Sequence, residues 1–208
     1  MRYKAILFDM DGTLLDTLTD MADAVNHILS VHGWPLRTTE EVRAFVGNGA
    51  RRLMERAVPP EVTGGDFETV LTEYRDWYQA HNCVATAPYP GIPALLAALA
   101  EAGIKTAVVS NKPDEAVRPL VAQHFGALAD IAMGETAQRR RKPAPDMVND
   151  ALAALGADKS RAVYVGDSEV DIETARNAGI PCISVTWGFR YREQLVEAGA
   201  TELAADAG

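Results

Sequence analysis

The sequence contains few residues of the kinds that crosslink proteins or bind zinc. Two cysteines, Cys83 and Cys182, occur among 208 residues. They cannot form a disulfide framework, and their flanks lack the spacing of a zinc site. The four histidines show no readable metal spacing either. We therefore interpret the cysteines as buried or idle thiols of a reducing compartment.

Long apolar runs are also missing. No stretch approaches the ~18–20 apolar residues that a membrane-spanning helix needs. The apolar run that ends at Phe8 is too short for the core of a secretion signal, and no small-residue cleavage site follows it. We expect a cytoplasmic protein that does not bind membranes.

Positive charge is scarce, with 20 lysines and arginines against 29 acidic residues and a net charge of −9. A nucleic-acid binder needs a basic face, so this class is disfavoured. An acidic protein that binds an anionic ligand has to place its cations locally. We interpret the run Arg139-Arg140-Arg141 as an exposed loop that raises the local positive potential.

Short apolar runs alternate with helical patterns over most of the chain. The runs are mostly continuous, as in strands buried on both faces of a parallel sheet. The predicted strands cover residues 3–8, 105–109, 162–165 and 182–186, with a weaker one at 130–133. The predicted helices cover residues 92–102, 114–124, 146–155 and 170–178. This alternation predicts an α/β fold with a doubly wound, Rossmann-like parallel sheet.

One long segment, residues 17–85, interrupts this alternation with helical patterns and no convincing strand. The predicted helices cover residues 19–31, 39–45, 50–57 and 67–80, with breaks that include Pro59-Pro60 and Gly64-Gly65. Four consecutive helices exceed what one crossover needs, although ordinary crossover helices remain the alternative. We predict a core domain of residues 1–16 and 86–208 and an inserted small helical cap domain of residues 17–85.

Polar side chains follow three of the predicted strands, and a lysine precedes a helix. Ligands of open α/β sheets bind beyond the carboxyl ends of the strands, so these residues should converge. They are Asp9, Asp11, Ser110, Asn111, Lys142, Asp167 and Asp171. Each fragment alone is common in turns and helix caps. Their joint occurrence, in this order, indicates a site.

Carboxylates gathered at one edge need a compensating charge. Asp9, Asp11 and Asp167 would repel one another unless they share protons or bind a cation. Oxygen ligands without histidine or cysteine suit Mg²⁺ rather than zinc. In the Asp-x-Asp pair, one carboxylate can attack phosphorus while its neighbour handles a proton.

These motifs together resemble the haloacid dehalogenase superfamily over essentially the whole chain. The first motif is Phe8-Asp9-Met10-Asp11-Gly12-Thr13-Leu14, and the later ones are Ser110-Asn111, Arg141-Lys142-Pro143 and Gly166-Asp167-Ser168-Glu169-Val170-Asp171. The helical insert resembles the small α-helical cap type. The chain ends soon after Leu203, so we expect a terminal helix of the relatives to be missing.

The resemblance implies a role for each motif residue. Asp9 would be the nucleophile and a metal ligand, and Asp11 the general acid and base. The backbone carbonyl of Asp11 would also bind Mg²⁺. Asp167 would bind the metal, with Asp171 supporting it directly or through water. Ser110, Asn111 and Lys142 would bind the phosphate, with Asn111 also near the cap interface.

Within the superfamily, the resemblance points to a phosphatase of small phosphorylated metabolites. Dehalogenases lack the second aspartate, present here as Asp11. Phosphonoacetaldehyde hydrolases need a cap lysine, and no lysine occurs between Lys4 and Lys105. The runs at residues 46–50, 53–57, 111–113 and 186–189 resemble those of phosphoglycolate phosphatases most closely. Sugar-phosphate phosphatases, including those acting on N-acetylmuramic acid 6-phosphate, remain an alternative. A phosphomutase and a non-catalytic phosphate-binding protein are further alternatives.

The turn Gly47-Asn48-Gly49 precedes a predicted helix in the cap. Glycines expose backbone amides, and a helix N-terminus favours anions. We expect this turn to read the organic part of the substrate, with a plain interhelical turn capped by Asn48 as the alternative. Arg51 and Arg52 are interpreted as solvated helix residues. The sequence does not indicate an oligomeric state.

Overall fold

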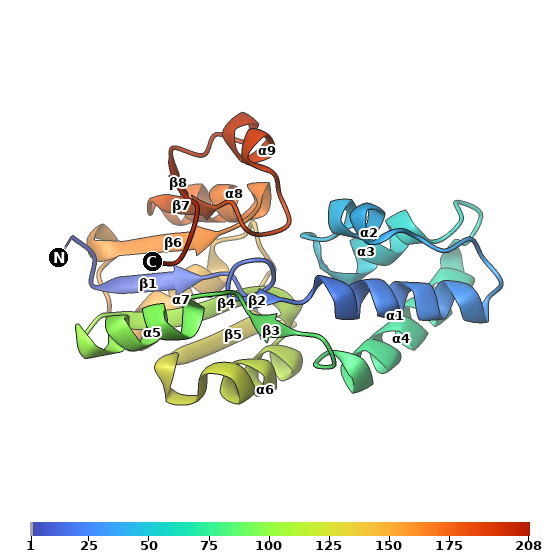
Figure 1. The fold of residues 1–208 in the computed structure, drawn as a ribbon, viewed down its shortest axis with the longest axis horizontal. Coiled ribbons are helices and arrows are strands. Elements are labelled where there is room, and N and C mark those ends of the chain that lie inside the picture. The colour runs from blue at the N-terminus through green and yellow to red at the C-terminus, as the bar shows by residue number, and fades with distance from the viewer. Residues whose placement is uncertain (1) are drawn as a thin grey trace. The chain divides into compact units, whose positions relative to one another are not determined.

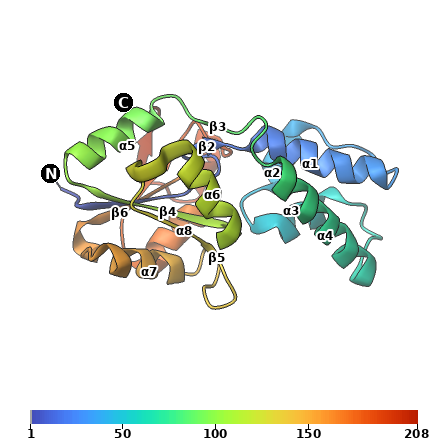
Figure 2. The same ribbon diagram turned by 90° about the horizontal axis from the view of Figure 1, so that it is seen from below.

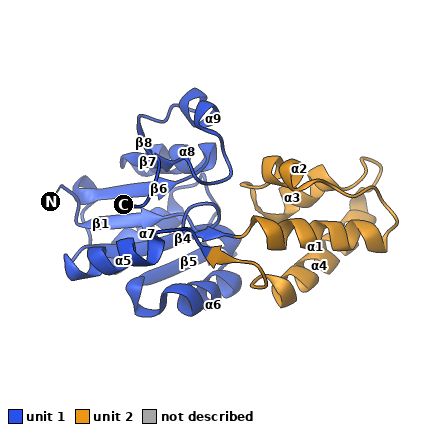
Figure 3. Ribbon diagram, in the orientation of Figure 1, with its two compact units in different colours: residues 1–16, 88–208 blue, residues 17–87 orange. Residues whose placement is uncertain are grey.

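The chain divides into two compact units in the computed structural model, which describes residues 2–208. Unit 1 comprises Met1–Asp16 and Pro88–Gly208, and unit 2 comprises Thr17–Ala87 (Figure 3). Unit 2 is thus an insertion into unit 1. The sequence placed the second boundary after residue 85, two residues earlier than the structure does.

Unit 1 is built on a six-stranded parallel sheet, visible in Figure 1. The strand order is β5-β4-β1-β6-β7-β8. The strands are β1 (Ala5–Phe8), β4 (Lys105–Pro113), β5 (Ile131–Glu135), β6 (Ala162–Gly166), β7 (Cys182–Val185) and β8 (Glu202–Ala204). Strand β1 lies between β4 and β6, with Ala5 opposite Lys105 on one side and Ala162 on the other. The predicted doubly wound fold is confirmed.

Helices cover both faces of this sheet. They are α5 (Ile92–Glu101), α6 (Asp114–Phe125), α7 (Asp146–Leu155), α8 (Glu169–Ala178) and α9 (Arg192–Glu197), with 3₁₀ turns η1 (Gly126–Leu128) and η2 (Lys159–Arg161). Figure 2 shows α5 and α6 on one face and α7 on the other. The chain winds from β1 to β5 in one direction and from β6 to β8 in the other. Right-handed crossovers therefore put the two sets of helices on opposite faces.

A hydrophobic core lies between the sheet and helices α7 and α8. Alternate strand residues such as Leu7, Val109 and Tyr164 face Met147 of α7 and Ala175 of α8, and all five are buried. Val108 and Val163, on the opposite sheet face, are buried as well. Burial on both faces explains why these strands read as continuous apolar runs in the sequence.

Unit 2 consists of helices α1 (Leu18–Val31), α2 (Thr39–Phe45), α3 (Gly49–Ala57) and α4 (Gly64–His81). The α2 start is a capping box, in which Thr38 and Glu41 satisfy each other's backbone amides. Apolar side chains from all four helices, such as Val25, Val42, Met54 and Tyr74, are buried.

Several details differ from the prediction. Gly64-Gly65 is the first turn of α4 rather than a break, because the first amides of a helix need no helical partner. The sequence also missed α9, β8 and the paired short strands β2 (Leu15–Asp16) and β3 (Ala87–Pro88). No helix within residues 2–208 is long and apolar enough to cross a membrane.

Candidate active site

Three of the predicted residues meet at the carboxyl edge of the sheet. Asp9 follows β1, Asp167 follows β6, and Lys142 lies in the loop before α7. The Lys142 Nζ lies 2.7 Å from Asp9 Oδ1. Asp9, Asp167 and Asp171 are all buried, and each offers one carboxylate oxygen within 4.8 Å of the others. Side chains far apart in the sequence thus form one compact charged group.

Neutral donors orient two of these carboxylates. The backbone amide of Met10 donates to Asp9 Oδ1 at 2.7 Å. Asp167 accepts from the Thr13 hydroxyl at 3.2 Å and from the Phe189 amide at 2.7 Å. The side chain of Asp167 is therefore held from two directions by groups that carry no charge.

Lys142 is held at both its head and its backbone. Its Nζ donates to Asp171 Oδ1 at 2.8 Å and to the Tyr164 hydroxyl at 3.2 Å. The Asn111 side chain grips the Lys142 backbone, accepting from its amide at 2.6 Å and donating to its carbonyl at 3.1 Å. These two bonds show that Asn111 positions Lys142. The predicted contact of Asn111 with phosphate stays a prediction.

Asp171 joins this group through the start of helix α8. Its Oδ2 accepts from the Ser168 hydroxyl at 2.6 Å and from the Ser168 amide at 3.1 Å, which forms a capping box. Asp171 is completely buried, and its other oxygen binds Lys142. One residue thus fixes the helix start and the lysine.

The balance of charge in this group leaves a surplus of negative charge. Burial and the neighbouring Asp171 raise the pKa of Asp9 well above its usual range, although Lys142 opposes this. Burial, followed by Asp171, raises the pKa of Asp167 to about 7. Burial alone would lower the pKa of Lys142, but Asp171 and Asp9 outweigh it and raise that pKa well above its usual value.

The donor set fits a divalent cation with a preference for oxygen. Three buried carboxylates meet a single ammonium, and raised carboxyl pKa values indicate that one more positive charge would be accommodated. The group consists of the carboxylates of Asp9, Asp167 and Asp171, and carboxylate oxygens are the ligands that hard divalent cations prefer. The carboxylate of Asp11 does not belong to this group.

Two glycines allow the backbone to approach Asp167 closely. Gly12 has a φ of +80°, and a Cβ there would overlap the Asp167 carboxylate. A Cβ on Gly188 would overlap both Asp167 and the carbonyl oxygen of Gly12. The Trp187 indole donates to the Thr13 carbonyl at 3.0 Å and fixes the same two loops. Only glycine fits at either position.

Asp11 lies beside a lysine that the sequence did not single out for a role. The Lys112 Nζ lies 2.6 Å from Asp11 Oδ1, and the Ser110 hydroxyl lies 3.5 Å from Asp11 Oδ2. Ser110 and Lys112 are two residues apart on β4, so their side chains share one face of the strand. That spacing was the available signal, but the predicted strand ended at residue 109, before both side chains.

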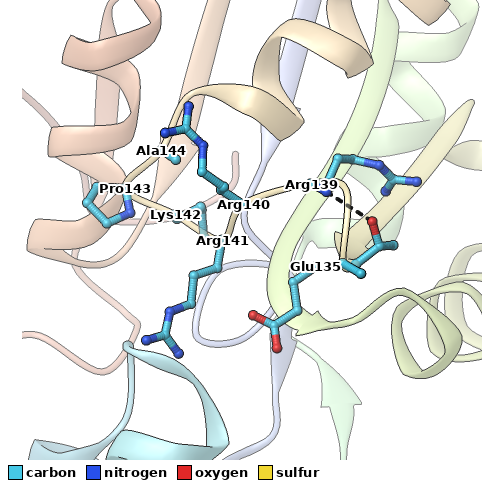
Figure 4. A pocket seen from close by; sticks show the side chains of 9 residues that line it. Glu135, Arg139, Arg140, Arg141, Lys142, Pro143 and Ala144 are labelled. Carbon is cyan, nitrogen blue, oxygen red and sulfur yellow. Dashed lines mark hydrogen bonds between the residues drawn. The ribbon is translucent and has the colours of Figure 1, made fainter.

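The arginine run lines a hollow of about 500 Å³ formed by residues 135–137 and 139–144. Arg139 pairs with Asp114 at 3.0 Å, and Arg140 pairs with Asp146 at 3.0 Å. The side chains of Arg140 and Arg141 extend from the loop in opposite directions (Figure 4). Arg139 and Arg140 are thus engaged in ion pairs, and Lys142 follows the arginine run into the buried cluster.

The predicted substrate-reading turn forms the start of α3 in unit 2. Gly47 and Gly49 have φ values of +115° and +80°. Asn48 stands at the N-cap position without a side-chain cap bond, and its Oδ1 accepts from Arg56 at 3.2 Å. Nearby, Arg51 forms a two-pronged pair with Glu68, consistent with a surface role.

Comparisons with known proteins show the family of the chain. The haloacid dehalogenase-like hydrolase family matches residues 6–185. An N-acetylmuramic acid 6-phosphate phosphatase of Pseudomonas aeruginosa is 37% identical, over 93% of this chain and 86% of its own length. A phosphoglycolate phosphatase of Caulobacter vibrioides is also 37% identical, over 95% and 84% of the two chains.

A solved structure of similar shape comes from Lactobacillus delbrueckii and is described as a candidate phosphoglycolate phosphatase. It is 39% identical, superposes with a TM-score of 0.96, and the match covers 100% of this chain and 96% of that one. The family match covers residues 6–185 and so includes Asp9, Ser110 and Asp167 with most of the sheet. This chain belongs to the haloacid dehalogenase-like hydrolase family.

Proposed function

We propose that this chain is a Mg²⁺-dependent phosphomonoesterase that acts on a small phosphorylated metabolite. Its first candidate substrate is 2-phosphoglycolate. The observation that carries the proposal is the contact of the Lys142 ammonium with Asp9 Oδ1 at 2.7 Å, inside a buried group with Asp167 and Asp171. The carboxylate of Asp9 has to attack a phosphoryl group that is itself negatively charged. A cation beside it attracts the phosphoryl group and offsets the charge that builds up.

The reaction proceeds in two displacements at phosphorus. An Asp9 oxygen forms a bond to phosphorus while the bond to the ester oxygen breaks, and Asp11 gives its proton to the departing oxygen. Asp11 then takes a proton from a water molecule, whose oxygen attacks the acyl phosphate and frees Asp9. Free phosphate and an alcohol are the products.

The residues around the nucleophile hold it and the phosphoryl group in place. Asp9 and Asp167 would bind Mg²⁺ together with the Asp11 carbonyl, and the ion would neutralise phosphoryl oxygens during transfer. Asp171, whose oxygens meet Lys142 and Ser168, is assigned first to holding Lys142, with support of the metal as its further role. Ser110, which is buried beside Asp11, binds a phosphoryl oxygen.

The second candidate is a sugar-phosphate phosphatase that acts on N-acetylmuramic acid 6-phosphate. The two named relatives with these different substrates are equally similar to this chain, at 37% identity. Overall similarity therefore does not separate the two substrates. A phosphatase panel that contains both compounds decides between them by their kcat/KM values.

The basic test uses p-nitrophenyl phosphate, which requires no recognition of an organic group. We expect turnover with Mg²⁺, and loss of turnover with EDTA or in Asp9→Asn. Asp206→Asn, an exposed aspartate near the end of the chain, serves as the control and keeps full activity. Turnover that persists in a correctly folded Asp9→Asn protein rejects the proposed nucleophile.

A further inference from the structure

Lys112 is a largely buried cation beside Asp11. Its Nζ lies 2.6 Å from Asp11 Oδ1, and the two side chains are only 11% and 16% exposed. Lysines are seldom buried to this degree unless a charge partner is close. The carboxylate that contacts Lys112 is the one assigned to protonate the departing oxygen.

The local structure of β4 directs this lysine to Asp11. Pairing of β4 with β5 shifts register between Val109 and Pro113, so residues 110–112 form an irregular segment. The Lys112 amide donates to the Ser110 hydroxyl at 3.2 Å, and both the Ser110 hydroxyl and the Lys112 ammonium lie beside the Asp11 carboxylate. Asn111 points the other way and grips Lys142. One segment thus contacts both the Asp11 carboxylate and the backbone of Lys142.

The two lysines define two positions in the site at which an anionic group can bind. Lys142 contacts Asp9 and Asp171 and belongs to the phosphoryl group. Lys112 contacts Asp11, the residue assigned to protonate the ester oxygen, so we place Lys112 beside that oxygen and the leaving group bonded to it. A second ammonium at this position would not attract a neutral leaving group. A leaving group with its own negative charge close to the ester oxygen would be attracted.

We propose that Lys112 binds a carboxylate attached to the carbon that carries the ester oxygen, which makes phosphorylated 2-hydroxycarboxylic acids the substrate class. This inference rests on the proposed function and names the residue that selects its substrate. An ammonium has three N–H donors, so it can hold one oxygen of Asp11 and one of the bound anion together. In these substrates a single carbon links the ester oxygen to the carboxylate, so the two groups lie close together. Asp11 and Lys112, which would serve them, are likewise in direct contact.

The test compares 2-phosphoglycolate with ethyl phosphate, which lacks the carboxylate but has the same two-carbon length. In Lys112→Met, the ratio of the two kcat/KM values should fall roughly 10- to 100-fold, the range for a lost hydrogen bond between charged groups. Lys112→Arg should keep most of the preference. Lys105→Met removes the same charge from the other end of β4, where Nζ binds the Leu155 carbonyl, and should leave the ratio unchanged.

A binding measurement separates recognition from the proton-transfer role of Asp11. In the Asp9→Asn background, Lys112→Met should weaken 2-phosphoglycolate binding in calorimetry by a similar factor. Inorganic phosphate should bind equally to both proteins. An equal loss on both esters, or an unchanged ratio in folded Lys112→Met, overturns the assignment.

The wild-type enzyme distinguishes failure of this inference from failure of the proposed function. If it hydrolyses p-nitrophenyl phosphate but does not prefer 2-phosphoglycolate to ethyl phosphate, the role of Lys112 is rejected and the phosphatase proposal stands. If it hydrolyses none of the three esters, the phosphatase proposal is rejected, and the inference with it.

Discussion

The titration of Asp167 links the protein's stability to metal binding. Burial and Asp171 raise its pKa to about 7. Between about pH 4 and about pH 7 the metal-free folded state therefore keeps a proton on Asp167 that the unfolded state releases. The bound proton stabilises the folded state, and this stabilisation is lost as the pH rises from about 4 to about 7. A metal ion needs the ionised carboxylate and must displace that proton below about pH 7.

The first prediction follows from this competition. The rise in Tm produced by Mg²⁺ should be larger at about pH 8 than at about pH 6, because no proton has to be displaced at the higher pH. Thermal unfolding with and without Mg²⁺ measures it. Asp167→Asn should show little Mg²⁺ effect at either pH, and an equal rise in the wild-type protein at both pH values contradicts the assignment.

Gly188 gives the second prediction, on the packing around Asp167. In Gly188→Ala the new Cβ would overlap Asp167 and the Gly12 carbonyl, so the carboxylate has to move. We expect the half-saturating Mg²⁺ concentration to rise roughly 10-fold or more, since small displacements of ligating or reacting groups are costly. Gly65→Ala, where no atom lies within 4 Å of the new Cβ, is the matched control. Unchanged Mg²⁺ dependence in folded Gly188→Ala would show that Asp167 tolerates the shift.

The sequence predicts side chains that directly follow a strand better than those whose direction depends on an irregularity. Asp9 and Asp167 had to converge with Lys142 once the parallel sheet was predicted, and the structure brings them together. Lys112 pairs with Asp11 from a segment in which β4 shifts register against β5, and no hydrophobic pattern records that shift. The clamp of Asn111 on the Lys142 backbone comes from the same segment.

At the scale of elements, one aspartate holds the start of α1 to the segment that leaves α4. Asp20 is buried and accepts hydrogen bonds from the backbone amides of Val84, Ala85 and Thr86 and from the Thr86 hydroxyl. These contacts close unit 2 by joining its first helix to its last residues. Four donors would lose their shared acceptor if this side chain were removed.

The third prediction is that Asp20→Ala destabilises the protein by about 2 kcal/mol or more, since hydrogen bonds to a charged group are lost and their donors are left without this acceptor. Urea unfolding measures the difference. Asp23→Ala, an exposed aspartate one turn along the same helix, should change stability by at most about 0.5 kcal/mol. Equal stability of Asp20→Ala and Asp23→Ala would reject the role of these contacts.

Prediction of elements from the sequence succeeded where a pattern was long enough. The helices α2 and α7 have the predicted bounds, because their apolar spacing and end signals agree. Strand β8 has three residues, Glu202, Leu203 and Ala204, and joins the sheet through pairing with β7. Such a short strand carries no period of its own, so its existence depends on the neighbouring strand.

For the whole molecule, a net charge of −9 coexists with a site for an anionic substrate. The structure resolves this by placing two lysines in the described active-site region, each in direct contact with a carboxylate. The insertion of unit 2 directly after the first motif and its return before β4 bring a second folded unit into the same chain. We expect that unit to influence which phosphate ester is accepted.

The last prediction tests that influence through Asn48. Its side chain does not cap α3 and accepts from Arg56, so the first amides of α3 receive no cap bond from it. If the turn reads the organic part of the substrate, Asn48→Ala should raise the KM for 2-phosphoglycolate roughly 10-fold, the scale of one lost hydrogen bond. Its kinetics on p-nitrophenyl phosphate should change little. Arg52→Ala, which removes a surface pair with Glu55 on the same helix, is the control. Equal losses on the two substrates would mean that the turn has no part in specificity and that selection rests on unit 1.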